Sequence, residues 1–412
     1  MTVTAADLTR ATDGLRKDPK DWSAWLEVAA ILAGLGAADD AELAFATIGE
    51  GARVMGRVAL AVACGRHLAQ LGSERGPELI DQVIGTYATG GPHFTFTTPP
   101  APEEPPKLPA PKGDAIVQAR AVIEQLGTWL TTRQPKQVPP APLLSSLSQP
   151  GARALVGVMT AHAIAAGESI IQIGEPATAL YWIAHGTVAI ARPRRPRDDD
   201  PAGTGDMALG ELHSGAFFGE IALVGGTTRT ASVNAVDDVW LLEIPARAVE
   251  SAASKYPKLA EVIAFHARAR LLSNVMRTSA LLRSIDGAAR DELLAKFKSQ
   301  QVAKRKRIIT TGQQNDSLWV VVSGTVEVLS GETVLAELGP GAAVGEMSLI
   351  SGAPANADVV ATEPVVLLRL AKQDFDAVAK RHPTLLDAVQ RIAVDREMAN
   401  RGMFQDATDL IV

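Results

Sequence analysis

Apolar residues recur at helical spacing through roughly the first ninety residues of the chain. In DWSAWLEVAAILAGLGAADDAELAFATIGEGA, the apolar positions follow one another three and four residues apart on both sides of a GLGAADD turn. RVALAVACGRHLAQLG and SERGPELIDQVIGTYA repeat this arrangement further along the chain. The pattern predicts an all-α, helical-hairpin domain over residues 1–90.

The first predicted hairpin resembles a tetratricopeptide repeat in part. Trp25, Ala41 and Phe45 stand where such a repeat has its large and small packing residues, whereas its usual Leu-Gly and closing proline are missing. Stacked helical hairpins commonly bind peptides or proteins. The resemblance therefore implies a protein partner for this region, and a small helical cap without a partner is the equally weighted alternative.

Two proline-rich stretches separate this region from the rest of the chain. GGPHFTFTTPPAPEEPPKLPAPK, over 90–112, and the later QPKQVPPAP cannot continue a helix or a sheet and indicate extended spacers. Between them, the sequence predicts one helix over 113–133. We assign residues 91–141 to a proline-rich linker with one helix.

The remainder of the chain contains an internal repeat. Residues 142–190 align without a gap with residues 280–328, at an offset of 138. Beyond that point the offset is 126, and FFGEIALVGG aligns with AVGEMSLISG. The first copy therefore holds about twelve extra residues within RPRRPRDDDPAGTGD, whose charge, proline and glycine predict a loop between strands.

Each copy has the same predicted order of elements. A short helix opens it, several strands of four to seven residues follow between glycine turns, and a helix closes it. This order is typical of a small β-roll with helical ends. The predicted fold class is thus α+β, with β-roll domains over 142–278 and 279–400 and a tail over 401–412.

The stretch FFGEIALVGGTTRTASVNA, residues 217–235, carries the candidate chemistry. Its Gly-Glu-x-Ala-Leu and Arg-Thr-Ala segments, behind AAGESIIQIGEPATALYWIAHGTVAI, resemble the ligand cassette of cyclic nucleotide-binding domains. Catabolite activators, kinase regulatory subunits and nucleotide-gated channels carry this module, and the resemblance covers both copies. It implies cAMP or cGMP as the ligand. The residues that it carries over to the ligand site of the first copy are Phe218, Gly219, Glu220, Ile221, Ala222, Arg229, Thr230 and Ala231.

The residue types at these positions suit a cyclic nucleotide. Gly219 lets the backbone approach the ligand, and the free amides at the start of a following helix favour an anion. The guanidinium of Arg229 matches two phosphate oxygens. An ionised Glu220 only accepts hydrogen bonds, and the resemblance assigns the ribose 2′-hydroxyl to it. Thr230 can reach the phosphate or the purine edge, and an internal Glu220–Arg229 salt bridge is the structural alternative for the charged pair.

The second copy departs from the family pattern. It keeps Gly345 and Glu346 in VGEMSLISGAPANADVVA, but Ala355 stands where the first copy has Arg229. Loss of a buried charged hydrogen bond costs about 2–5 kcal/mol, enough to move a micromolar site to millimolar or weaker. We therefore expect this degenerate site not to bind a cyclic mononucleotide. Residues 304–307, KRKR, are expected to lie on the first strand of this copy as a solvated basic edge.

Composition narrows the function classes. The net charge of −6 argues against a general polyanion binder, and only about a dozen residues follow the last predicted helix, so no DNA partner is predicted. Cys64 is the only cysteine and no two histidines stand at ligand spacing, so no metal is predicted. A signal peptide, a membrane-length apolar run and a catalytic motif are not recognised. These features favour a non-catalytic, cytoplasmic protein that has no cofactor and does not enter a membrane.

The sequence supports two hypotheses. In the first, the chain is a receptor: domain 142–278 binds cAMP or cGMP, the closing helix at 257–277 shifts, and the change reaches the second domain or a protein bound by the helical region. Phe265, Leu271 and Leu272 are candidates for an apolar lid over the purine. In the second, both β-rolls are structural modules of an assembly. The choice of purine, the identity of the partner and the formation of a homodimer stay open.

Overall fold

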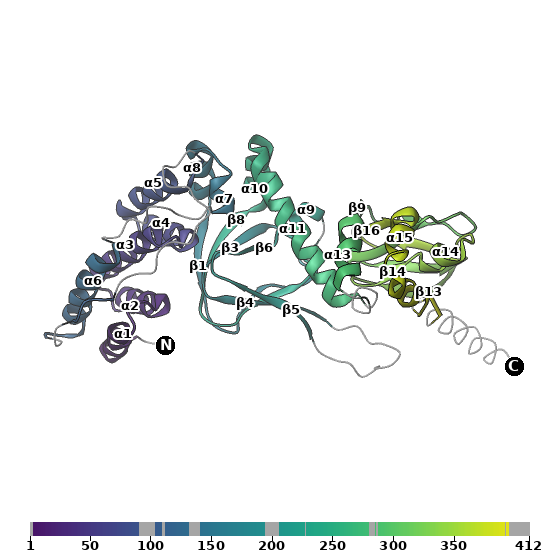
Figure 1. Ribbon diagram of the computed structural model, residues 1–412. Helices are drawn as coiled ribbons and strands as arrows, with labels where there is room; N and C mark the ends of the chain where they lie inside the picture. Colours follow the sequence, from purple (N-terminus) through teal and green to yellow (C-terminus); the bar gives the residue numbers. More distant parts are fainter. Residues whose placement is uncertain are drawn as a thin grey trace. The chain divides into compact units, whose positions relative to one another are not determined.

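Two compact units make up the described part of the chain, each shown in Figure 1. The computed structural model describes residues 3–89, 104–108, 112–131, 141–193, 206–226, 228–279, 285, 287–391 and 393–394. One unit comprises residues 1–223 and 231–265, and the other comprises residues 224–230 and 266–412. The first holds the helical region and a β-roll, and the second holds another β-roll. The predicted α+β fold class, an all-α region followed by two β-rolls with flanking helices, is confirmed.

The helical region of the first unit consists of helices that pack on their neighbours. They are α1 (Ala5–Lys17), α2 (Trp22–Gly34), α3 (Ala38–Val54), α4 (Val58–Gln70), α5 (Arg75–Tyr87) and α6 (Ala115–Thr131). Each of α1 to α4 packs on the next helix, and α6 returns to pack on α1 and α3. The helix predicted over 113–133 is α6. Trp25, Ala41 and Phe45, the predicted packing residues, are all buried.

Polar side chains fix the ends of these helices and tie α6 to the others. Thr4 and Asp7 form a capping box at the start of α1. The carboxylate of Asp21 accepts a hydrogen bond from the amide of Ser23 at 2.8 Å, which begins α2. A carboxylate oxygen of Asp40, in the first turn of α3, accepts from Nη2 of Arg120 on α6 at 2.9 Å. The helix in the linker is thus joined to the hairpins by an ion pair as well as by its apolar face.

Two four-stranded antiparallel sheets form the β-roll of the first unit. One contains, in spatial order, β1 (Thr160–Ile164), β8 (Val239–Pro245), β3 (Ala179–His185) and β6 (Phe217–Phe218). The other contains β2 (Ser169–Ile171), β7 (Ser232–Ala235), β4 (Thr187–Pro193) and β5 (Asp206–His213). The helices of this copy are α7 (Pro142–Ser145), α8 (Gln149–Gly157), α9 (Glu220–Gly225), α10 (Ala246–Lys255) and α11 (Pro257–Thr278).

The β-roll of the second unit repeats this topology. One sheet contains β9 (Lys298–Val302), β16 (Val365–Ala371), β11 (Ser317–Ser323) and β14 (Ala343–Val344). The other contains β10 (Arg307–Ile309), β15 (Asp358–Ala361), β12 (Val326–Ser330) and β13 (Thr333–Leu338). Its helices include α13 (Gly287–Lys296), α14 (Glu346–Ser351) and α15 (Lys372–Ala379). Matching positions of the two copies make the same backbone hydrogen bond. The amide of Val236 donates to the carbonyl of Thr187 at 2.9 Å in the first copy, and the amide of Thr362 donates to the carbonyl of Thr325 at 3.0 Å in the second.

The extra residues of the first copy fall between β4 and β5. β4 ends at Pro193 and β5 begins at Asp206, whereas Gly331 and Glu332 alone join the matching strands β12 and β13. The predicted position between strands is therefore confirmed. The loop itself, residues 194–205, lies outside the described residues.

The basic run at 304–307 was predicted to lie on the first strand of the second copy, but it does not. β9 ends at Val302 and β10 begins at Arg307, so the preceding three basic residues lie in the connection between these strands. Arg305 takes a left-handed conformation there, with φ 64°, and the first copy has Gly167 at this position with φ 85°. The prediction was wrong because arginine and lysine give no turn signal, whereas glycine does.

One hydrophobic core joins the helical region to the first β-roll. The ring of Trp240, on β8, lies 5.4 Å from the ring of Phe45 on α3 and 5.3 Å from that of His67 on α4. Nε of Arg66 donates to the carbonyl of Met159 at 2.7 Å, and α4 packs on β1, β3 and β8 (Figure 1). Burial lowers the pKa of His67, which favours the neutral ring inside this cluster. The helices and the first β-roll therefore form one packed body.

Candidate ligand-binding site

The first cassette, residues 217–231, begins with a sharp passage from strand to helix. Phe218, on β6, pairs with Tyr181 on β3, and their rings are stacked with centroids 5.3 Å apart. Gly219 follows with φ 90°, a conformation that side chains other than hydrogen rarely adopt. α9 begins at the next residue, Glu220. The glycine thus lets the chain turn from β6 directly into the short helix that the sequence predicted, and its approach to a ligand stays a prediction.

The predicted residues on α9 differ in exposure. Glu220 is fully buried, Ala222 is buried and Ile221 is half-buried. A carboxylate in the first turn of a helix interacts favourably with the positive end of the helix dipole. Removing it from water is costly unless donors or cations replace the lost hydration. Glu220 therefore lies inside the domain, where the surrounding residues fix its position.

The remaining predicted residues follow α9 and precede β7. Arg229 is only 5 % exposed, and Thr230 and Ala231 are half-buried. Residues 224–230 belong to the second unit and Ala231 to the first. A guanidinium in such a buried position retains its charge and has five donors to satisfy. The predicted contact of Arg229 with a phosphate stays a prediction.

The second cassette, residues 343–357, keeps the strand-to-helix passage of the first. Gly345 has φ 87°, and α14 begins at Glu346, which is 2 % exposed. A Cβ atom on Gly345 would lie 2.5 Å from Nδ2 of Asn315 and 2.6 Å from the carbonyl oxygen of Ser317. Only glycine fits here, both for its backbone conformation and for lack of space.

Ala355 occupies the position of the arginine in the second cassette. It is buried and belongs to an apolar cluster with Ile309 and Trp319. Its amide donates to the carbonyl of Gln313 at 2.9 Å, and its carbonyl accepts from the amide of Gly312 at 2.7 Å. Where the first copy has a guanidinium, the second copy thus has a methyl group in apolar packing. The backbone of this residue is hydrogen-bonded to a neighbouring turn.

That turn was not among the predicted site residues. Nδ2 of Asn315 donates to the carbonyl of Ser317 at 2.7 Å and to that of Gly345 at 3.3 Å, and Nε2 of Gln314 donates to Gly352 at 2.8 Å. In the sequence, the signal is the polar GQQNDS, which aligns with GEPATA in the first copy. Amide side chains from this turn tie both ends of α14 to the domain.

The predicted lid residues are not brought together over either cassette by any described contact. Phe265, on α11, is 69 % exposed. Leu271 and Leu272 follow on the same helix, but their side chains lie outside the described residues. The closing helix begins at Pro257, as predicted, because proline suits the first turn of a helix and separates α11 from α10. The lid stays a prediction.

Neither a metal-binding cluster nor a membrane-spanning helix occurs among the described residues. Among them, no group of three or more His, Cys, Asp or Glu side chains is arranged to hold a metal ion. None of the helices described is both long and apolar enough to pass through a bilayer. Cys64 is buried, which raises the pKa of its thiol and makes the thiolate rare.

Comparisons with known proteins identify both β-rolls. The sequence model of the family described as "Cyclic nucleotide-binding domain" matches residues 161–256 and 299–382. A cyclic nucleotide-gated potassium channel of Mesorhizobium japonicum is 32 % identical over 121 residues, which is 29 % of this chain and 30 % of the channel. A cGMP-dependent protein kinase of Caenorhabditis elegans is 26 % identical over 230 residues, 54 % of this chain and 27 % of the kinase. A cAMP-dependent protein kinase regulatory subunit of Candida albicans is 23 % identical over 236 residues, 57 % of this chain and 47 % of that protein.

These matches span less than half the length of each relative. Among solved structures, the cAMP-bound regulatory domain of a Toxoplasma gondii kinase is 18 % identical, with a TM-score of 0.29 and coverage of 61 % of this chain and 92 % of that one. A Thermus thermophilus catabolite activator protein is 29 % identical, with a TM-score of 0.29 and coverage of 32 % and 63 %.

Proposed function

Two cyclic nucleotide-binding domains follow one another in this chain, and we propose that it is a non-catalytic receptor for cAMP or cGMP that binds the ligand in the first cassette. The observation that carries the proposal is the burial of two opposite charges, Glu220 and Arg229, in the first cassette, against Ala355 in the second. The fold of both cassettes is the same, so the arginine is not needed to form the domain. The family resemblance assigns the phosphate contact to this arginine, and the second cassette lacks it.

In this proposal, different residues of the first cassette contact different parts of the cyclic nucleotide. Arg229 donates to the phosphate, and the backbone at Gly219 approaches the same group. Glu220 accepts the hydrogen bond of the ribose hydroxyl, for which an ionised carboxylate is suited. Thr230 contacts the phosphate or the edge of the purine. The second domain holds no cyclic mononucleotide because a methyl group cannot replace the guanidinium.

The relay of binding uses the elements next to the cassette. α10 and then α11 follow the last strand of the β-roll, and the helical region packs on the same β-roll through Trp240. A change in the first domain therefore reaches both α11 and a protein bound to the helices. The ligand drives this change only if it binds one arrangement more tightly, and a hundredfold preference supplies about 2.7 kcal/mol. The location that fits this function is the cytoplasm.

Calorimetric titration of the full chain with cAMP and with cGMP tests the proposal. We expect one site per chain, and the tighter of the two nucleotides identifies the purine that the receptor prefers. AMP, which carries an open phosphate monoester, is the matched control and should bind more weakly. No heat and no thermal shift with either cyclic nucleotide at millimolar concentration would rule the receptor out.

A structural scaffold is the second candidate, and the second domain favours it. That domain keeps its fold and its strand-to-helix passage although Ala355 has replaced the arginine. Both domains could then serve as interaction modules, with the helical region as the docking site for a protein. The same titration separates the candidates, because a scaffold binds no cyclic nucleotide in either domain.

A further inference from the structure

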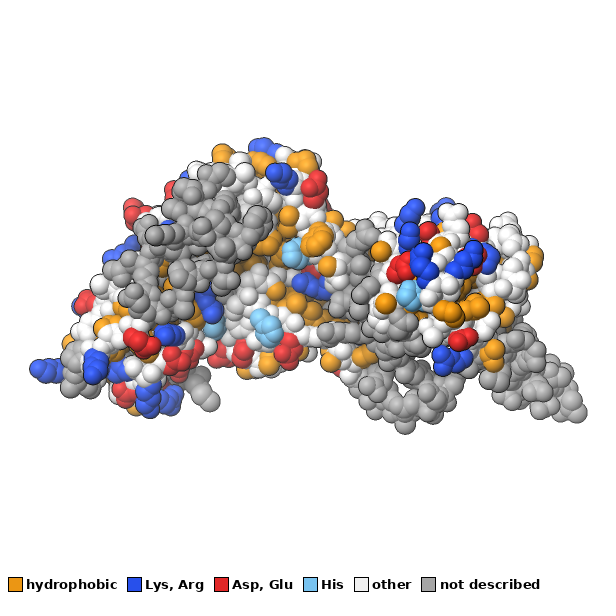
Figure 2. Space-filling model, viewed as in Figure 1, with side chains coloured by type: hydrophobic (Ala, Val, Ile, Leu, Met, Phe, Trp, Pro, Cys, Tyr) orange, Lys and Arg blue, Asp and Glu red, His pale blue; other side chains and the backbone are white. Residues whose placement is uncertain are grey.

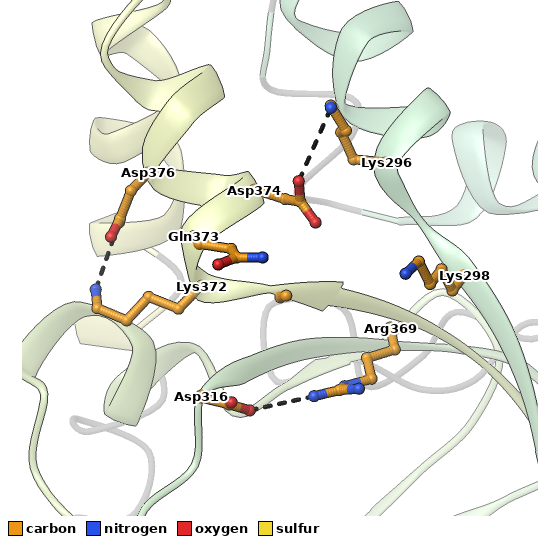
Figure 3. A pocket seen from close by; sticks show the side chains of 9 residues that line it. Lys296, Lys298, Asp316, Arg369, Lys372, Gln373, Asp374 and Asp376 are labelled. Carbon is orange, nitrogen blue, oxygen red and sulfur yellow. Dashed lines mark hydrogen bonds and ion pairs between the residues drawn. The ribbon is translucent and has the colours of Figure 1, made fainter.

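A cavity of about 590 Å³ lies in the second β-roll (Figure 3). It touches the second cassette at one point, where Nζ of its lining residue Lys372 donates to the carbonyl of Leu349 at 2.8 Å. It opens between the end of α13, the strands β9 and β16, and the start of α15. Four of its lining residues are basic: Lys296, Lys298, Arg369 and Lys372. None of its lining residues belongs to residues 343–357. Figure 2 shows basic and acidic side chains intermixed on one face of this domain.

Two of these cations face each other across neighbouring strands. In the register of β16 and β9, Arg369 is directly opposite Lys298. Like charges at directly opposed positions of an antiparallel pair are destabilising. The first β-roll has Thr160 opposite Glu243 at the same register. The unfavourable pair is therefore specific to the second copy and is not a requirement of the fold.

The other two cations also differ from the first copy. Lys372 is the first residue of α15, where the positive end of the helix dipole disfavours a cation. The first copy has Ala246 at this position, and it has Val158 where the second copy has Lys296. The second copy has thus placed a cation at each of four positions where the first copy is neutral or acidic.

Carboxylates in the cavity balance part of this charge. Asp374 lies 3.8 Å from Lys296, Asp376 lies 3.4 Å from Lys372, and Asp316 lies 3.3 Å from Arg369. Hydrogen bonds from Ser317 and then from Arg369 lower the pKa of Asp316, so this carboxylate is ionised at neutral pH. Four cations thus face three carboxylates. Among the described residues, no ion pair is recorded for the exposed Lys298.

We propose that this cavity binds the phosphoryl group of a small organic phosphate between Lys298 and Arg369. A phosphate monoester carries nearly two negative charges and offsets the repulsion of the opposed pair. Nε of Arg369 already donates to Ser317 and Nη2 to Asp316, so the guanidinium offers its remaining N–H groups to the phosphate, and the ammonium of Lys298 acts as a point charge. The cavity volume is within the range that holds small-molecule ligands, and the exposed Gln373 at its rim offers donors and an acceptor to the rest of the molecule.

The test uses the full chain with Arg229→Ala, so that phosphate bound in the first cassette does not enter the measurement. Inorganic phosphate and glycerol 2-phosphate are titrated by calorimetry and thermal shift, with chloride holding the ionic strength constant. Lys298→Thr and Arg369→Glu each introduce the residue that the first β-roll carries at the same register, so the fold accepts them. Lys304→Ala is the matched control, because it also removes one exposed cation and introduces the residue of the first copy.

We expect Lys298→Thr to weaken phosphate binding about tenfold and Arg369→Glu to weaken it further, whereas Lys304→Ala leaves it unchanged. Without phosphate, Lys298→Thr should melt no lower than its parent, because it removes a repulsive pair. Tighter binding of glycerol 2-phosphate than of inorganic phosphate supports an organic ligand, and equal or weaker binding overturns that part. No binding of either anion, or equal losses in Lys298→Thr and Lys304→Ala, overturns the site. Failure of the receptor function leaves this result unaffected, since the two sites share no residue.

Discussion

The two cassettes have the same frame and a different charge. Gly219 and Gly345 hold nearly the same left-handed conformation, and a buried glutamate begins the short helix after each of them. The arginine is missing from the second cassette, where Ala355 joins the apolar core. The glycine and the glutamate therefore survive without the phosphate contact, and neither of them alone indicates a ligand. The difference in charge between the cassettes comes from this one guanidinium.

Removing that guanidinium should make the first cassette behave like the second. Arg229→Ala is expected to lower the affinity for the cyclic nucleotide by about 2–5 kcal/mol, a factor of about thirty to several thousand, because the phosphate loses its charged partner. Calorimetry on the full chain measures the change. Arg10→Ala, at an exposed helix position, is the control and should bind as the parent does. Unchanged binding by Arg229→Ala would show that the pocket has been misassigned.

Restoring the arginine to the second cassette tests the comparison in the other direction. Ala355→Arg places a charge in the cluster of Ile309 and Trp319, so we expect it to lower the free energy of unfolding by about 2–4 kcal/mol. Urea unfolding measures this loss, and Ala355→Ser gives the cost of a small polar group at the same site. Nucleotide titration should still show one site per chain. A stable variant with two sites would mean that the arginine alone separates the cassettes.

The contact with the helical region distinguishes the two β-rolls in a second way. Trp240 packs on Phe45 and His67, whereas the second copy has Val366 at the matching position of β16. Trp240→Val should lower the free energy of unfolding by about 2–3 kcal/mol, because it leaves a cavity between the helices and the sheet. Thermal and urea unfolding measure the effect. Val236→Ala, at an exposed position, should change stability by less than about 0.5 kcal/mol, and an equal loss in both variants would contradict the shared core.

Acid should affect the two β-rolls differently through one matched hydrogen bond. In the second copy, Asp358 accepts from the amide of Thr311 at 2.7 Å, and this bond, with help from Arg307, lowers the pKa of Asp358. In the first copy, Oγ of Ser232 accepts from Ile173 at 3.1 Å and does not titrate. A lowered carboxyl pKa stabilises the fold above the ordinary pKa of about 3.9 and loses this effect as the pH falls through the folded value.

Asp358→Ser therefore tests the smallest of these differences. The variant should be less stable than the parent near pH 6, and the gap in melting temperature should close as the pH falls toward 3. Ser232→Ala is the control, and its deficit should not change with pH. A gap for Asp358→Ser that stays constant over this range would mean that the carboxylate contributes only by its shape.

Much of the fold could be predicted from the sequence, because the same pattern of elements occurs in both copies of the repeat. The β-strands, the helix at 113–133 and the strand-to-helix passage at Gly219 all follow from local patterns that the structure reproduces. The core shared by the helices and the first β-roll could not be predicted, because Phe45 and Trp240 each have the pattern of an ordinary buried residue. The opposed Lys298 and Arg369 were missed for a related reason: their conflict appears only when the strand register is known.

The shared core also sets an order of events during synthesis. Phe45 leaves the ribosome roughly two hundred residues before Trp240, which is about ten to forty seconds at usual elongation rates. During that interval, the apolar face of α3 and α4 has no sheet to cover it. The nascent helices therefore have to wait for β8, or be shielded by a chaperone, before the first unit closes.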